Sequence, residues 1–173
     1  MSTHYTLKSI IIPLNRNKVT YISPKDADLW RGRWYAQIAP TYARRSFIVT
    51  RHLPTVNGKR PTQTLHRLIL SRMLGRELTC KEEVDHRDCN PLNNRRSNLR
   101  LATKSQNMMN RGRFSSNTSG FKGVTKRATG KWRARIQVNG LREHIGDFDT
   151  PEEAYAAYCE AAKEKHGKYA RLK

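Results

Sequence analysis

The sequence predicts a mixed α+β fold made of short strands and few helices. Runs rich in β-branched and aromatic residues recur near the start, at 18–22, 33–39 and 46–50. One helical stripe follows at 65–74. From residue 120 onward, strands and one long helix follow each other in a regular pattern. We therefore divide the chain into a strand-rich region at 1–62, a module at 63–110, a polar linker at 111–119 and a second module at 120–173.

The helix at 65–74 is predicted from an apolar stripe at helical spacing, formed by Leu65, Leu68, Ile69 and Met73. Gly75 follows this stripe and favours a helix end, because glycine adopts the left-handed conformation of many C-terminal caps. Upstream, Ser23 before Pro24 predicts a second helix start, with the serine side chain as the cap.

A carboxylate, an imidazole and two carboxamides lie in one short segment, as Asp85, His86, Asn98 and Asn107. Asp85 is a hard oxygen ligand of the kind that Mg²⁺ prefers, and Asn107 can add a carbonyl oxygen. His86 has a pKa suited to general-base work near neutral pH. Asn98 is placed to hydrogen-bond the imidazole and fix its tautomer. Since phosphodiester hydrolysis needs an activated water and a cation, this segment indicates a one-metal nuclease site.

The charge of the chain indicates what class of partner it binds. There are 34 Lys and Arg against 14 Asp and Glu, which gives a formal net charge of +20. No acidic residue occurs between Asp88 and Glu143. Such a field favours nucleic acid or an anionic membrane surface and disfavours basic partners. Charge alone leaves open a generally basic surface, as in ribosomal proteins.

Three further features bear on location. No run approaches the roughly 20 apolar residues that span a bilayer, so we expect no membrane partner. The first 12 residues have no signal-peptide pattern. The three cysteines, Cys80, Cys89 and Cys159, lack CxxC spacing and indicate free thiols. We therefore expect an intracellular protein.

The C-terminal module alternates apolar and polar residues. We expect strands at 121–126, 131–138 and 141–148, with Asn139-Gly140 as the hairpin turn. In the middle strand the apolar face comprises Trp132, Ala134, Ile136 and Val138, and the polar face comprises Arg133, Arg135 and Gln137. An Ala-rich helix that starts with a capping box at Thr150 should cover the apolar face. We expect the opposite face to be cationic, without an acidic side chain.

The run VDHRDCNPLNNRRSNLRLATKSQNMMN resembles the HNH homing endonucleases common in phages, which have a ββα-metal fold. This resemblance implies that His86 is the general base and Asn98 its positioner. It also implies that Asp85 and Asn107 bind a divalent metal, Mg²⁺ in the first instance, with Mn²⁺ as the alternative. Asn107 departs from the H-N-H pattern, where the family has histidine, but H-N-N variants occur in the phage subfamily that this sequence resembles.

The preceding run LHRLIL is similar to the same subfamily. Its His66 and Arg67 are accessory candidates that either face the site or a phosphate, or have a structural role.

Residues 119–173 resemble the AP2 DNA-binding domain along its whole length. In that family a three-stranded antiparallel sheet packs on one helix and enters the major groove, where Arg can pair bidentately with guanine. Trp132 should lie in the core and not stack on a base. Alignment of the strands implies eight DNA contacts: Lys122, Thr125, Arg127, Arg133, Arg135, Gln137, Arg142 and His144.

These resemblances imply a phage-encoded, metal-dependent HNH endonuclease with an AP2 targeting domain, which hydrolyses double-stranded DNA in the cytoplasm of a bacterial host. One active site per monomer favours nicking over double-strand cleavage. Two rivals stay open: a catalytically inactive, sequence-specific DNA-binding protein on the HNH scaffold, and a structural RNA-binding protein.

Overall fold

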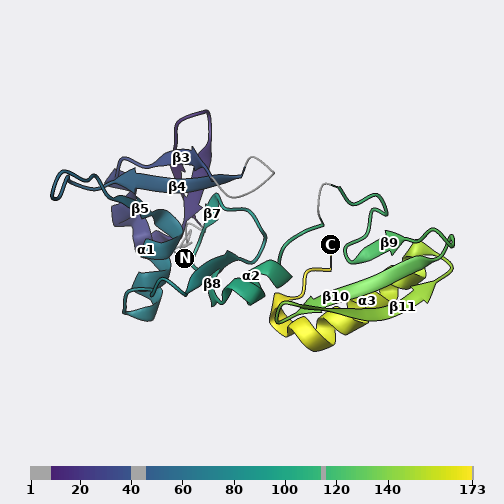
Figure 1. Cartoon of the computed structure of the whole chain (residues 1–173). Coiled ribbons are helices and arrows are strands. Elements are labelled where there is room, and N and C mark those ends of the chain that lie inside the picture. Colours follow the sequence, from purple (N-terminus) through teal and green to yellow (C-terminus); the bar gives the residue numbers. More distant parts are fainter. Residues whose placement is uncertain (1–8, 40–45, 114–115, 173) are drawn as a thin grey trace, which may run out of the picture. The chain divides into compact units, whose positions relative to one another are not determined.

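The computed structural model describes residues 9–39, 46–113 and 116–172, and it divides into two compact units, Met1–Leu101 and Ala102–Lys173. Small sheets and few helices make up both units, which confirms the predicted α+β class (Figure 1). The predicted linker at 111–119 includes residues 114 and 115, which lie outside the described residues. Residues 1–8 and 40–45 of the predicted strand-rich region also lie outside them. Within the described ranges, no helix is long and apolar enough to cross a membrane.

The first unit is built from three small sheets within the described ranges. One has the strand order β1-β2-β7, with bounds Ile10–Pro13, Val19–Ile22 and Asn93–Asn94. Another has the order β3-β4-β5, with bounds Tyr35–Ile38, Phe47–His52 and Thr62–Thr64. The third pairs β6 with β8, with bounds Glu83–His86 and Leu99–Ala102. The predicted strands at 18–22, 33–39 and 46–50 correspond to β2, β3 and β4.

Two helices of the first unit follow the sequence signals in different degrees. α1 spans Leu65–Leu74 and ends at Gly75, which has a φ of 68°, as predicted. η1 spans Pro24–Arg31 and is a 3-10 helix. Ser23 does not cap it through its side chain, contrary to the prediction, because Ser23 Oγ accepts a hydrogen bond from the Arg96 backbone N–H at 2.9 Å.

One hydrophobic core joins the strand-rich start of the chain to the segment after residue 62. Its buried side chains are Ile12, Ile22, Leu29, Trp34, Val49, Leu65, Ile69 and Leu99. The parallel pairing of β2 with β7, in which Tyr21 lies opposite Asn93, links the same two regions through the backbone. The described part of residues 1–62 therefore supports the segment that carries Asp85 and His86.

A buried ion pair connects η1 to the turn between β7 and β8. The Asp26 carboxylate is 0% exposed and accepts hydrogen bonds from Arg96 Nε at 2.8 Å and Nη2 at 2.7 Å. Removing one partner of a buried pair leaves an uncompensated charge. Asp26→Ala should therefore lower the free energy of unfolding by about 3 kcal/mol, the lower end for such a pair because Arg96 is partly exposed. Urea denaturation measures this loss.

Asp28→Ala is the matched control for that experiment. Asp28 also accepts two hydrogen bonds from one guanidinium, that of Arg72, at 2.8 Å each, but its side chain is 62% exposed. An exposed pair contributes less than about 1 kcal/mol. Equal losses in the two variants would contradict the structural role assigned to Asp26.

The second unit contains α2, a three-stranded antiparallel sheet and α3 (Figure 1). α2 spans Lys104–Met109. The sheet has the order β11-β10-β9, with β9 at Val124–Lys126, β10 at Trp132–Val138 and β11 at Leu141–Phe148. α3 spans Pro151–His166, begins with the predicted Thr150–Glu153 capping box, and is followed by η2 at Gly167–Tyr169.

α3 packs on the apolar face of the sheet, as predicted. The core contains Val124, Ala134, Ile136, Ala154, Tyr158 and Ala162, with Trp132 partly buried against it. β9 begins at Val124 and not at the expected residue 121, because Gly123 has a φ of 79°. A Cβ atom at Gly123 would lie 2.3 Å from the Tyr158 ring of α3. Any residue larger than glycine at this position would therefore clash with that ring.

Candidate functional site

Asp85 and His86 lie at the end of β6, beside the neighbouring strand β8. Asp85 is only 2% exposed. Its Oδ2 accepts a hydrogen bond from Arg100 Nε at 2.6 Å and forms an ion pair with Arg100 Nη2 at 2.5 Å. Arg100 belongs to β8. The β6–β8 sheet therefore fixes the Asp85 carboxylate through an arginine that the sequence analysis did not single out.

The His86 imidazole is held by a buried carboxamide. Asn94 Oδ1 lies 3.2 Å from His86 Nε2, and the Asn94 side chain is fully buried. Asn94 Nδ2 donates to Thr20 Oγ1 at 2.8 Å and to the Pro91 carbonyl at 3.2 Å. Because a carbonyl can only accept, this arrangement assigns Nδ2 and leaves Oδ1 facing the ring.

This network assigns the tautomer of His86. Asn94 Oδ1 is an acceptor, so the neutral imidazole donates its proton from Nε2 and carries its lone pair on Nδ1. Thr20 Oγ1 donates in turn to the Leu92 carbonyl at 2.7 Å, which completes a chain of three side chains. A neutral imidazole with a fixed orientation and a defined basic nitrogen is what general-base chemistry requires.

Asn98 has a different set of contacts from the predicted one. Its Nδ2 donates to Asp88 Oδ1 at 2.9 Å and to the Asn93 carbonyl at 2.7 Å, and its Oδ1 accepts from the Asp88 backbone N–H at 3.1 Å. Asn98 thus closes the loop between β6 and β7, and Asn94 occupies the position at the imidazole expected for Asn98. The predicted role of Asn98 as positioner of the His86 imidazole remains a prediction, and the contacts seen here are with Asp88 and Asn93.

The pKa of His86 lies below its ordinary value, chiefly because the ring is buried. The hydrogen bond to Asn94 and the charges of Asp88 and Asp85 oppose that shift. Burial thus favours the neutral imidazole at neutral pH. The negative charges of Asp88 and Asp85 stabilise the imidazolium that forms when the ring accepts a proton. Both properties suit a base that must be unprotonated before it acts.

His66 and Arg67 separate into two roles. The His66 ring lies edge-on to the His86 ring, with 5.5 Å between the ring centroids, and burial lowers the pKa of His66 to about 3. It is therefore a neutral neighbour of the candidate base. Arg67 donates to the backbone carbonyls of Glu82, Leu78 and Thr79 at 2.8–3.0 Å. These contacts hold the segment before β6 and support a structural role for Arg67.

The donor chemistry around Asp85 fits a hard cation held by few protein ligands. Within the described residues, no three His, Cys, Asp or Glu side chains form a metal-binding cluster. Mg²⁺ is commonly bound by one or two carboxylates together with water and substrate phosphate, which requires no such cluster. Arg100 contacts Oδ2 of Asp85, so a cation at this carboxylate would compete with the guanidinium. Asn107 lies in α2, in the second unit, and its role as a ligand remains a prediction.

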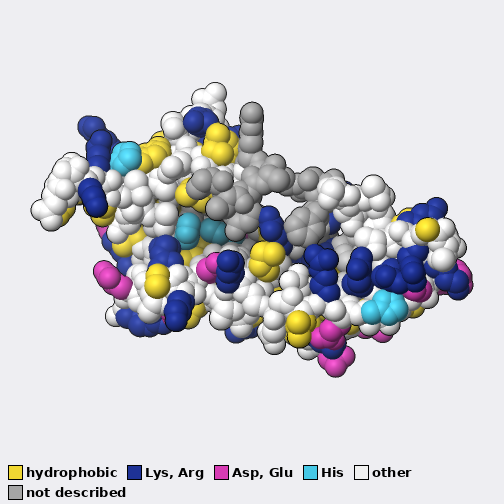
Figure 2. All heavy atoms as spheres, viewed as in Figure 1, with side chains coloured by type: hydrophobic (Ala, Val, Ile, Leu, Met, Phe, Trp, Pro, Cys, Tyr) yellow, Lys and Arg dark blue, Asp and Glu magenta, His cyan; other side chains and the backbone are white. Residues whose placement is uncertain are grey.

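The polar face of the β9–β11 sheet carries most of the predicted DNA contacts. The register pairs Arg133 with Thr125, Arg135 with His144 and Gln137 with Arg142, and directly paired residues project from the same face. Arg127 follows β9. Lys and Arg side chains lie in a row along the sheet of this unit (Figure 2).

The expectation of an acid-free face is wrong, because Asp147 lies on it. A β-bulge between Ala134 and Arg135 shifts the register, so that Asp147 pairs with Arg133. Asp147 accepts hydrogen bonds from Arg127 Nη1 at 2.8 Å and Arg133 Nε at 3.1 Å, and His144 Nε2 lies 3.4 Å away. These partners, Arg133 first, hold the pKa of the Asp147 carboxyl well below its usual range. Among the described residues, the guanidinium groups of Arg135 and Arg142 have no such partner.

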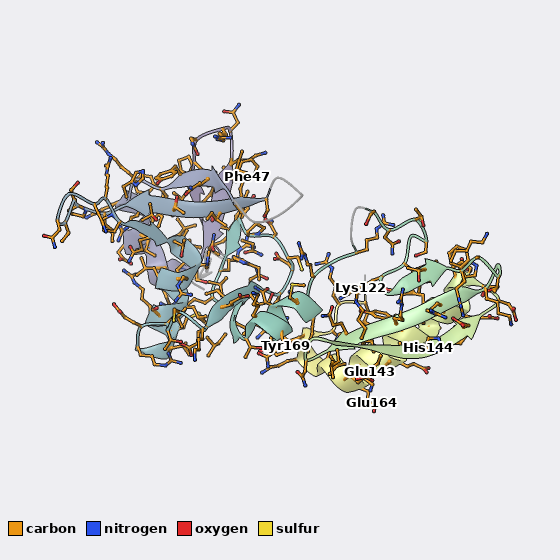
Figure 3. All side chains as sticks on the ribbon, viewed as in Figure 1. Phe47, Lys122, Glu143, His144, Glu164 and Tyr169 are labelled. Atoms are coloured by element: carbon orange, nitrogen blue, oxygen red, sulfur yellow. The ribbon has the colours of Figure 1, made fainter. Side chains whose placement is uncertain are left out.

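Lys122 differs from the other predicted contacts. Its Nζ donates to the Met109 carbonyl at 2.6 Å, at the end of α2, and it lies 6.0 Å from the centroid of the Tyr158 ring. Figure 3 shows Lys122 on the segment before β9, whereas His144 lies on β11. The ammonium group therefore faces α2 and does not project from the polar face.

Comparison with known proteins separates the same two parts. Residues 63–109 match the family model for HNH endonucleases, and residues 119–168 match the model for the AP2 domain. No solved structure matches the chain.

Three curated proteins illustrate the similarity. An uncharacterized HNH endonuclease of Acanthamoeba polyphaga mimivirus is 38% identical over 106 residues, which is 61% of this chain and 54% of that protein. Protein 3.8 of Escherichia phage T7 is 35% identical over 91 residues, 52% of this chain and 74% of that protein. The dehydration-responsive element-binding protein 2A of Arabidopsis thaliana is 48% identical over 54 residues, 30% of this chain and 16% of that protein. The chain thus spans about half of the mimivirus protein.

Proposed function

The chain belongs to the HNH endonuclease family and carries an AP2 domain, and we propose that it is a metal-dependent enzyme that hydrolyses DNA phosphodiester bonds near sites selected by that domain. The observation that carries this proposal is the neutral His86 imidazole, which Asn94 holds in a fixed orientation and which follows the buried Asp85 carboxylate in β6.

Each site residue has a distinct role in the proposed reaction. His86 Nδ1 accepts a proton from the attacking water, and Asn94 keeps the ring in position. Asp85 would hold the divalent cation, which we propose to be Mg²⁺, and the family resemblance implies Asn107 as a further ligand, as in the ββα-metal fold. When bound, the cation neutralises charge that develops on the phosphate and stabilises the leaving 3′ oxygen. The products are 5′ phosphate and 3′ hydroxyl ends.

We further propose a homing-type enzyme that acts as a monomer and nicks one strand, since one chain supplies one such site. We also propose an intracellular location, in the cytoplasm of a bacterial host for a phage-encoded protein. Within the described residues Cys80, Cys89 and Cys159 form no disulfide, as is usual in a reducing compartment.

One observation favours a second candidate, a DNA-binding protein without catalytic activity. The Arg100 guanidinium already neutralises Asp85, and it competes with a cation for the same carboxylate. A supercoiled-plasmid assay separates the two functions. An active nuclease converts the plasmid to the nicked form in Mg²⁺ and not in EDTA, whereas the second candidate shifts the plasmid in a gel and leaves it supercoiled under both conditions.

The two unpartnered arginines of the polar face should dominate DNA binding by the AP2 domain. Arg135→Ala with Arg142→Ala is expected to weaken binding to a preferred duplex by about 2–6 kcal/mol if both read bases, at roughly 1–3 kcal/mol per bidentate contact. Arg127→Ala with Arg133→Ala should cost less, because Asp147 already offsets those charges. Fluorescence anisotropy with a duplex selected from a random pool measures both. Equal losses would contradict the distinction drawn from Asp147.

A further inference from the structure

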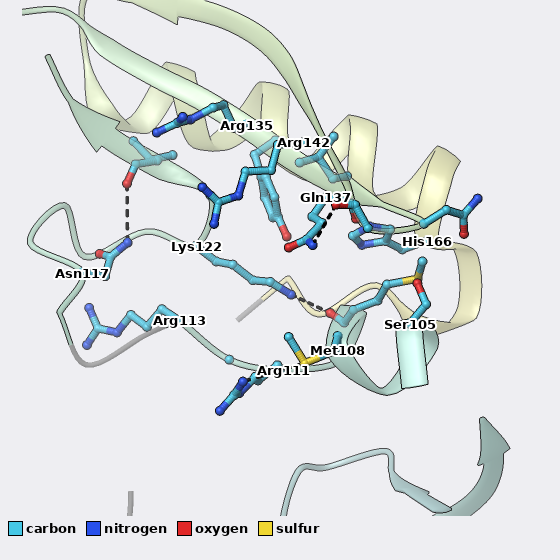
Figure 4. A pocket seen from close by; sticks show the side chains of 18 of the residues that line it. Ser105, Met108, Arg111, Arg113, Asn117, Lys122, Arg135, Gln137, Arg142 and His166 are labelled. Carbon is cyan, nitrogen blue, oxygen red and sulfur yellow. Dashed lines mark hydrogen bonds between the residues drawn. The ribbon is translucent and has the colours of Figure 1, made fainter. Parts of the chain in front are cut away.

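A cavity of about 700 Å³ opens beside the polar sheet face, within the second unit. It is bounded by α2, by the segment after α2, and by β9, β10 and the start of β11 (Figure 4). This volume is typical of ligand-binding pockets in proteins. Its lining includes the apolar or aromatic residues Met108, Val124, Ile136 and Tyr158.

The charged residues of this cavity are all cationic. None of its described lining residues is acidic, and the cations are Lys104, Arg111, Arg113, Lys122, Arg135 and Arg142. Figure 4 shows Arg111, Arg113, Lys122 and Arg142 around the same opening. Asp147, which offsets the arginines at the other end of the sheet, is not among the lining residues. The cavity is therefore suited to a polyanion.

Two of these cations are held by backbone carbonyls. Lys122 is fixed by the Met109 carbonyl at 2.6 Å, and Arg113 Nη1 donates to the Gly120 carbonyl at 3.0 Å. These contacts connect the segment after α2 to the module that carries the sheet. Arg135 and Arg142 belong both to the polar face and to the cavity wall. A ligand bound on the polar face can therefore extend into the cavity.

We propose that this cavity holds a stretch of the sugar–phosphate backbone of the DNA that binds the β9–β11 sheet, with Arg111, Arg113 and Lys104 on its phosphates. This inference rests on the proposed DNA binding by the AP2 domain. It extends the footprint of that domain to α2 and to the segment that the sequence analysis treated as a linker. Phosphate contacts fix register and orientation without reading sequence. The cavity would thus set the position of the DNA strand without changing the preferred sequence.

The test compares the salt dependence of DNA binding in matched double variants. Arg111→Ala with Arg113→Ala removes two cavity cations. Arg31→Ala with Arg33→Ala removes two exposed arginines at the same spacing in the first unit. Binding to a random duplex is titrated with NaCl, since each neutralised phosphate contributes about 0.9 to the slope of log K against log salt. The cavity variant should lose about 1.8 in slope relative to the control, with its preferred sequence unchanged.

Lys104→Ala is a second variant, because Arg113 also contacts the backbone and its loss could disturb folding. Lys104 is exposed at the start of α2, and its removal should lower the slope by about 0.9. Thermal melting identifies any variant that does not fold. Slopes equal to that of the control in every folded cavity variant overturn the proposal.

Three further outcomes distinguish the alternatives. Titration calorimetry with thymidine 5′-monophosphate should give no binding at millimolar concentration. Binding that the cavity variant abolishes, with an unchanged DNA slope, would overturn the proposal in favour of a free-nucleotide site. If the wild-type chain does not bind duplex DNA at all, the proposed function itself fails. If the wild type binds duplex and the cavity variants match the control, only the cavity inference fails.

Discussion

His86→Ala is expected to slow DNA nicking by at least about a hundredfold, because removal of a general base typically costs a factor of 10² to 10⁴. The variant should bind DNA with nearly unchanged affinity, since the sheet that carries the predicted base contacts lies in the second unit. Single-turnover cleavage of a labelled plasmid and fluorescence anisotropy measure the two quantities separately. Such a split between rate and affinity identifies a group that acts in the chemical step.

His52→Ala is the matched control. His52 is an exposed histidine of β4 that lies outside the candidate site. Its Nε2 is hydrogen-bonded to the Tyr35 hydroxyl at 2.8 Å. The control should retain wild-type cleavage. Near wild-type cleavage by the His86 variant would remove this residue from the mechanism.

The pH profile gives an independent readout of the same base. A general base acts when it is unprotonated, so the rate falls as pH decreases through the pKa of His86. Burial lowers that pKa from its ordinary value of 6.5. Nicking should therefore persist as the pH falls through 6.5 and decline only at more acidic pH. A rate that is already halved at pH 6.5, in protein that circular dichroism shows to be folded, would contradict the buried, neutral state of His86.

Local signals in the sequence predicted the elements whose formation depends on near neighbours. The stripe before Gly75 identified α1, and the Thr150–Glu153 capping box identified the start of α3. Strict alternation in the middle strand also identified which of its residues face α3. In these cases, one element and its own periodicity contain the necessary information.

The contacts of His86 depended on residues distant in sequence. Asn94 is held in place by Thr20 of β2, which is 74 residues away in sequence, so the sequence alone did not identify Asn94 as the partner of His86. The spacing pattern pointed instead to Asn98, whose contacts are local, with Asp88 and Asn93. The loop is rich in residue types that favour turns, so its composition does not distinguish Asn94 from the neighbouring asparagines.

The acidic residue on the polar face was missed for a geometric reason. Alternation from Arg142 and His144 would continue to residue 146 and leave Asp147 on the other face. The bulge at Ala134/Arg135 places two residues of β11 opposite one position of β10, which reverses the alternation and brings Asp147 to Arg133. A bulge of this kind leaves no reliable signal in a single sequence. Gly146 lies beside it, and glycine inside a strand is common at bulges.

Substitution at Asp85 is expected to abolish or strongly weaken Mg²⁺-dependent cleavage, because a cation held by few protein ligands cannot spare one. Asp85→Ala would also leave the Arg100 guanidinium buried without its partner. Asp85→Asn is therefore the sharper variant, since a carboxamide keeps an acceptor for Arg100 and removes the negative charge. Equilibrium unfolding checks that this variant is folded before its activity is compared.

The diagnostic measurement is a titration of the nicking rate with Mg²⁺. Asp85→Asn should raise the half-saturating Mg²⁺ concentration by at least about tenfold, since even residues that only support metal ligands cost 10- to 100-fold in affinity. Asn107→Ala should shift it in the same direction if its amide oxygen is a ligand. A residue that merely stabilised the fold would lower the rate at every Mg²⁺ concentration without moving the midpoint. Wild-type nicking that continues in excess EDTA would rule out the one-metal mechanism, because Asp85 would then serve only to anchor Arg100.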